Sequence, residues 1–258
     1  MTLSKASLVT VLAMACLVFT HFSSAEGASI MSSFDSSQTI TLVHGSAAPT
    51  HAVIWLHGLG ATADDFPAIV PHLGLASSPT IRFIFPQAPT RPISVNNGMQ
   101  MPGWYDIRGV KIEDKEDLQG MRESQGILEA LIDQQIDQGI ASQNIVVAGF
   151  SQGGAVAYYT GIRTKHHLGG ILALSTYLSF ADVSESEQSG VNFDTPILAM
   201  HGRLDPVVPF DLGLQSAERL KHLGYPLEWH SYTMEHTVIA EQLVDVGGWI
   251  NAVFASKE

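Results

Sequence analysis

The sequence predicts an α/β fold with a mostly parallel central sheet and helices on both of its faces. Short apolar runs bounded by glycine or proline recur along the 258 residues, as expected for strands buried on both faces. Segments with helical spacing of apolar residues lie between them, and this alternation implies parallel strands joined by helices. We expect one domain over residues 38–258, because this length buries a substantial core.

The first residues are interpreted as a signal peptide over 1–25, followed by a linker over 26–37. Lys5 precedes an apolar run over 6–22, and small residues at 23–25 offer a cleavage site. The run lacks the length and flanks of a transmembrane helix, so no membrane span is expected. A working signal would make the protein periplasmic or secreted. Alternatively Met31 is the true start and the protein is cytoplasmic.

The amino-acid composition limits the classes of molecule that the protein is expected to bind. The formal net charge is -12, which argues against nucleic acid and anionic membrane surfaces, since both attract clustered Lys and Arg. A neutral or apolar small molecule fits better. The single cysteine, Cys16, lies in the predicted signal peptide, so no disulfide or thiol chemistry is expected in the mature domain.

The first strands are predicted over 38–43, at a sheet edge, and over 52–56, in the sheet centre. The turn His57-Gly58-Leu59-Gly60 ends the central strand and is positioned to offer backbone N–H groups to a reacting oxygen. His57 itself is interpreted as a structural residue. An acidic cap at 64–65 predicts a helix to about residue 73, and residues 81–85 form the next strand.

The segment 86–106 is predicted to be a long, rigid, non-helical loop, because it begins with closely spaced prolines. Long loops in compact domains are usually functional. Met99, Met101 and Trp104 in this loop are therefore candidates for binding the substrate, with methionine adapting to a flexible acyl chain. The competing interpretation is a small core of their own beneath the loop.

The second half continues the alternation of strands and helices. An amphipathic helix is predicted over 118–138, and 175–194 is predicted to be an irregular surface excursion. The adjacent His166 and His167 point in different directions on regular structure and make a poor metal pair, so they are interpreted as surface residues. Neither a metal nor a cofactor is expected. The remaining strands are predicted over 145–148, 170–174, 196–200 and 227–232, with helices to about 164, over 210–223 and to 254.

Ser151 lies in a predicted nucleophile elbow. Glycines at 149 and 153 flank the serine between an apolar strand and a helix, and they let the backbone turn sharply so that the serine oxygen stands clear of the strand. The alternative is a purely structural, glycine-rich turn in which the serine has no catalytic role. The partners that a nucleophile needs decide between the two.

Two further residues complete the predicted constellation. Asp205 lies in a proline-rich loop after the strand at 196–200, and His236 follows the last strand. Ser151, Asp205 and His236 therefore follow three different strands in the chain order of α/β-hydrolases. His236 would take the Ser151 proton and Asp205 would orient the imidazole, while backbone N–H groups of Leu59 and Gln152 would form the oxyanion hole.

At these residues the sequence resembles the phospholipase/carboxylesterase family of α/β-hydrolases, which includes lysophospholipases and acyl-protein thioesterases, and in particular its bacterial carboxylesterase branch. The resemblance implies a fold without a large cap domain and hydrolysis of short-chain carboxylic esters, with lysophospholipids, S-acyl thioesters or acylated proteins as further substrates. A homodimer is also considered. The matching stretches are WLHGLG (55–60), FPQAPTRP (85–92), GMQMPGWYDI (98–107), GFSQGGAVA (149–157), LALSTYL (172–178), HGRLDPVVP (201–209) and MEHTV (234–238).

Three other functions make different demands on the sequence. A metallohydrolase would need a spaced cluster such as H-E-x-x-H, which the sequence lacks. A catalytically silent ligand-binding protein on the same fold would be expected to lose one of Ser151, Asp205 and His236. A serine peptidase would share all three, and only substrate tests separate it from an esterase.

Overall fold

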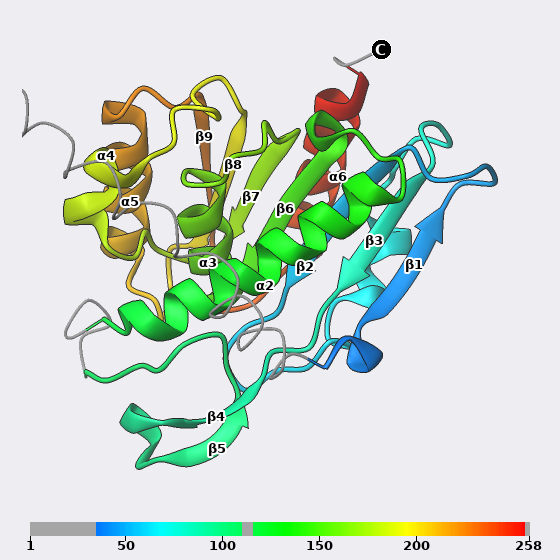
Figure 1. Cartoon of the computed structure of the whole chain (residues 1–258). Helices are drawn as coiled ribbons and strands as arrows, with labels where there is room; N and C mark the ends of the chain where they lie inside the picture. The colour runs from blue at the N-terminus through cyan, green and yellow to red at the C-terminus, as the bar shows by residue number, and fades with distance from the viewer. Residues whose placement is uncertain (1–34, 110–115, 256–258) are drawn as a thin grey trace, which may run out of the picture.

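The computed structural model describes residues 35–109 and 116–255, and Figure 1 shows how its elements are arranged. The predicted signal peptide and most of the predicted linker lie outside the described residues. A seven-stranded sheet runs through the domain in the order β1-β3-β2-β6-β7-β8-β9. Its strands are β1 (Ile40–His44), β2 (His51–Leu56), β3 (Ile81–Phe85), β6 (Ile145–Phe150), β7 (Gly170–Leu174), β8 (Ile197–Gly202) and β9 (Leu227–Tyr232).

The sheet is mostly parallel, as predicted. Only β1 pairs antiparallel, with β3 at the sheet edge, and the other neighbouring strands are parallel. Every residue of β2 and of β7 is buried, which explains why these strands read as continuous apolar runs.

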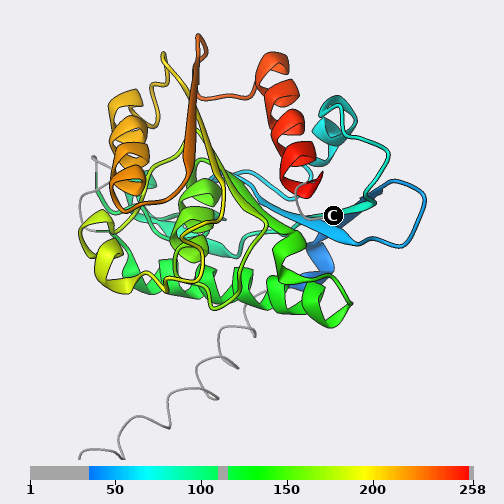
Figure 2. The same ribbon diagram turned by 90° about the horizontal axis from the view of Figure 1, so that it is seen from above.

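Side chains of alternate strand residues pack into two separate hydrophobic cores, one on each face of the sheet. Ile54 and Val147 pack on one face of the sheet, and Val53 and Val146 pack on the other. Helices cover both faces, as Figure 2 shows from above, which confirms the predicted fold class. The longer helices are α2 (Leu118–Asp137), α3 (Gln152–Gly161) and α5 (Phe210–His222) on the first face and α6 (Ala240–Ala255) on the second.

Two local predictions were wrong. The helix expected from the acidic cap at 64–65 is a short 3-10 helix, η2 (Pro67–His72), because Pro71 inside it supplies no N–H for an α-helical ladder. The expected loop at 86–106 contains a two-stranded hairpin, β4 (Thr90–Ile93) with β5 (Met99–Pro102). The remaining short helices are η1 (Ser36–Gln38), η3 (Ser94–Asn96), η4 (Ser142–Asn144), η5 (Ala181–Val183) and α4 (Ser184–Glu187).

Across residues 35–109 and 116–255, no helix is both long and apolar enough to cross a membrane.

Candidate active site

Ser151 forms a sharp turn between β6 and α3. Its backbone φ of 54° and ψ of -120° lie in a region that side chains rarely adopt, and such strain concentrates at functional sites. The Ser151 N–H donates to the Leu174 carbonyl at 2.8 Å, and Thr176 Oγ1 donates to the Ser151 carbonyl at 2.6 Å. The turn is thus fixed from the neighbouring strand.

The glycines on either side of Ser151 are required by packing. A Cβ on Gly149 would collide with the backbone of Gly153, and a Cβ on Gly153 would lie 2.5 Å from the Leu56 carbonyl oxygen. Both are backbone contacts, so no side chain can move aside to make room. The glycines therefore allow α3 to begin directly against the end of β2.

His236 and Asp205 lie in line with Ser151. The Ser151 Oγ is 2.9 Å from His236 Nε2, and His236 Nδ1 is 2.7 Å from Asp205 Oδ2. Because the carboxylate accepts at Nδ1, the proton resides there and Nε2 is free to accept the serine proton. The predicted residues come together from the ends of β6, β8 and β9.

Asp205 is held as a carboxylate. Burial of its side chain opposes ionisation, but hydrogen bonds from His236 and from the backbone N–H groups of Val208 and Val207 outweigh it. The pKa of Asp205 therefore lies below its ordinary value. At neutral pH the negative charge needed to orient and stabilise a charged imidazole is in place.

The turn after β2 lies directly beside Ser151. A Cβ on Gly58 would be 3.5 Å from the Ser151 Cβ, and Gly58, Leu59 and Ser151 line the same cleft. Within the described residues, the backbone N–H groups of Leu59 and Gln152 have no hydrogen-bond acceptor. These two amides stay the oxyanion donors that the sequence predicts, and the proposal for them is argued below.

The cleft beside Ser151 has a volume of about 430 Å³ and is mostly apolar. Phe66 and Ile69 from the η2 region contribute to it, together with Val207 beside Asp205 and Val238 after His236. The sequence analysis did not predict that these residues line the cleft at Ser151. The available signal was their position next to the functional turns, since a neighbour of a site residue in sequence is often at the rim of the site.

The three residues predicted to bind substrate lie elsewhere. Met99 is 63% exposed on the β4–β5 hairpin, and Met101 is half-buried with its Sδ accepting from Asn96. Trp104 is fully buried, its indole N–H donates to the His57 carbonyl, and its backbone N–H donates to Gln152 Oε1. None of the three is part of the lining of the cleft at Ser151.

His57 is structural, as its position before the turn suggests. Its Nδ1–H donates to the Gly58 carbonyl at 2.8 Å, and its Nε2 accepts from the Ala88 N–H at 3.0 Å. Burial lowers the pKa of His57, so it is neutral and both ring nitrogens are occupied.

A second buried histidine, which sequence reasoning missed, holds the loop of Asp205. His201 Nε2 donates to the Val208 carbonyl at 3.0 Å and lies 3.4 Å from Asp205 Oδ2.

In the part of the chain that the structure describes, no group of three or more His, Cys, Asp or Glu residues is arranged to hold a metal ion.

The fold and the site define the class of this protein: it is a serine hydrolase built on the α/β-hydrolase fold. The sequence matches the family described as Phospholipase/Carboxylesterase over residues 37–254. Acyl-protein thioesterase 1 of Gibberella zeae is 41% identical over 219 residues, which cover 81% of this chain and 92% of that protein. Acyl-protein thioesterase 1 of Yarrowia lipolytica is 38% identical over 213 residues, covering 81% and 94%.

A solved structure supports the same family membership. The crystal structure of acyl-protein thioesterase 2 of Zea mays is 26% identical with a TM-score of 0.74, covering 83% of this chain and 99% of that one. The chain belongs to the phospholipase/carboxylesterase family.

Proposed function

We propose that the protein cleaves carboxylic esters and S-acyl thioesters, including those of acylated proteins, through an acyl-enzyme on Ser151. The observation that carries the proposal is the continuous hydrogen-bonded line Ser151–His236–Asp205 at the edge of an apolar cleft. The fungal relatives named as acyl-protein thioesterases support the thioester part.

The reaction follows from the geometry. Ser151 Oγ attacks the acyl carbonyl carbon while its proton passes to His236 Nε2, and the resulting oxyanion accepts hydrogen bonds from the Leu59 and Gln152 amides. The tetrahedral centre then collapses, and the thiol or alcohol leaves with the proton from His236. A water molecule, deprotonated by the same histidine, hydrolyses the acyl-enzyme and restores Ser151.

The apolar lining of the cleft fits an acyl chain, and burial of each CH₂ group contributes about 0.8 kcal/mol. Lysophospholipids are a further substrate class within this proposal. The narrower resemblance to bacterial carboxylesterases stays a prediction, because the thioesterase relatives reported above are fungal. A homodimer also stays a prediction, which light scattering on the purified protein would test.

The test is the Ser151→Ala variant. We expect a folded protein whose hydrolysis of nitrophenyl butanoate and of an S-acylated peptide falls by several orders of magnitude, because only the oxyanion hole and binding remain. Labelling by a fluorophosphonate should be lost with it. Retention of more than about a tenth of the activity with an unchanged circular dichroism spectrum would exclude Ser151 as the nucleophile.

Two other classes of function make different forecasts. A ligand-binding protein without activity would not turn over any ester in a chain-length series, although it would bind fatty acids. A serine peptidase would cleave amide bonds in unmodified peptides at rates comparable with esters. We expect neither outcome.

A further inference from the structure

Trp104 lies between the two turns that carry the proposed oxyanion amides. Its indole Nε1–H donates to the His57 carbonyl at 2.8 Å, and its backbone N–H donates to Gln152 Oε1 at 2.7 Å. His57 is two residues before Leu59, and Gln152 supplies the other amide itself. One residue is thus bonded both to the turn that carries the Leu59 amide and to the side chain of Gln152.

The segment around Trp104 is fixed by further contacts. Gln152 Nε2 donates to the Tyr105 carbonyl at 2.6 Å, so the Gln152 side chain is held at both of its polar atoms. A Cβ on Gly103 would lie 3.0 Å from Leu59 Cδ1, which shows how closely the segment approaches the first turn. The segment therefore contacts each turn in more than one place.

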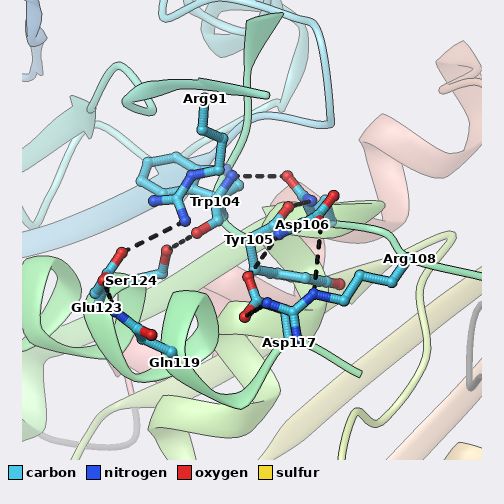
Figure 3. Close-up of polar contacts among 10 residues, drawn as sticks. Arg91, Trp104, Tyr105, Asp106, Arg108, Asp117, Gln119, Glu123 and Ser124 are labelled. Atoms are coloured by element: carbon cyan, nitrogen blue, oxygen red, sulfur yellow. Dashed lines mark hydrogen bonds and ion pairs between the residues drawn. The ribbon is translucent and has the colours of Figure 1, made fainter. Parts of the chain in front are cut away.

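Side chains at and near helix α2 also hold this segment, as the dashed contacts in Figure 3 show. The Ser124 hydroxyl, fully buried on α2, donates to the Trp104 carbonyl. Next along the chain, the Asp106 N–H donates to Asp117 Oδ2 at 3.0 Å, and Arg108 pairs with Asp117 Oδ1 at 2.7 Å. The position of Trp104 is thereby set by a rigid helix rather than by the turns alone.

We infer that Trp104 is a positioning residue that sets the spacing between the Leu59 and Gln152 amides of the oxyanion hole. This inference rests on the proposed function. Trp104 makes no contact with the cleft, so it acts only through the two turns. Hydrogen bonds from the hole strengthen as charge develops on the oxygen, so a change in their spacing affects the transition state more than the ground state.

The first variant is Trp104→Phe, which keeps an aromatic ring in the buried site but removes the Nε1–H donor. We expect kcat for nitrophenyl butanoate to fall about ten- to a hundredfold, with KM within about twofold of wild type. This decrease in kcat is no larger than the one expected from removing a hydrogen-bond donor of the oxyanion hole itself. Inhibition by a boronic acid, whose adduct with Ser151 places an oxygen in the hole, should weaken by a similar factor.

The matched control is Trp249→Phe. Trp249 is also buried, on α6, and its ring packs against Gly170 at the start of β7, the end of the strand opposite the site. The control removes the same indole group and should lower the unfolding midpoint in urea comparably while leaving kcat and boronic acid affinity unchanged. A purely structural role for Trp104 predicts that the two variants behave alike.

A second variant covers the case in which Trp104→Phe does not fold. Ser124→Ala removes the bond to the Trp104 carbonyl and leaves every group of the hole intact, and it should lower kcat about three- to tenfold with KM unchanged. Unchanged kcat and boronic acid affinity in Ser124→Ala, or in a folded Trp104→Phe, would overturn the inference. The proposed function would fail separately, through an active Ser151→Ala protein.

Discussion

Gly153→Ala tests the close approach of α3 to the end of β2 on which the site depends. A Cβ at this position would lie 2.5 Å from the Leu56 carbonyl oxygen and 2.6 Å from that of His57. The first of these distances is about 0.9 Å short of the 3.4 Å at which ordinary contact begins. Because both oxygens belong to the backbone, β2 and α3 must move apart.

The expected cost has two parts of opposite sign. Overpacking of this kind destabilises by about 1–3 kcal/mol, whereas Ala in place of Gly inside a helix stabilises by about 0.5–1 kcal/mol. We therefore expect the free energy of unfolding to fall by about 0–2.5 kcal/mol. Activity should suffer more, because a displacement of about 1 Å between the turn at Leu59 and Ser151 is enough to lower kcat/KM about a hundredfold.

Urea unfolding followed by circular dichroism and hydrolysis of nitrophenyl butanoate measure the two effects. Gly248→Ala is the matched control, because Gly248 also lies within a helix, α6, and a Cβ there meets no atom within 4 Å. The control should gain about 0.5–1 kcal/mol and keep full activity. If Gly153→Ala were as stable and as active as Gly248→Ala, the close packing described above would be refuted.

Three other predictions concern pH, metal and the N-terminus. Burial lowers the pKa of His57, so the unfolded chain binds more protons than the folded one below the free-histidine pKa of about 6.5, and stability falls as pH drops through that region. In His57→Gln the free energy of unfolding should depend less on pH between about 6.5 and 5, and an unchanged slope would contradict the assignment. Dialysis against EDTA should leave ester hydrolysis unchanged, and inhibition reversed by zinc would refute the metal-free mechanism. Mass spectrometry of fractionated cells should find a periplasmic or secreted product that begins at Glu26, whereas a cytoplasmic product starting only at Met31 would exclude export.

The sequence by itself determined the seven strands of the central sheet and the chain order of the proposed catalytic residues. These signals are local: a strand buried on both faces must be apolar throughout, as β6 is, and a sharp turn at Ser151 requires glycine on either side. Asp205 and His236 could be placed because parallel strands bring their carboxyl ends to one edge of the sheet.

Only the tertiary structure decided which large side chains reach the cleft. Trp104, predicted to bind substrate, is held inside by bonds to residues 47 and 48 positions away along the chain, and no local pattern encodes such partners. The cleft is lined instead by Phe66 and Ile69, which the predicted α-helix did not place at the site. The exposure of a loop side chain depends on what folds over it, and that is settled by long-range packing rather than by the residue or its neighbours.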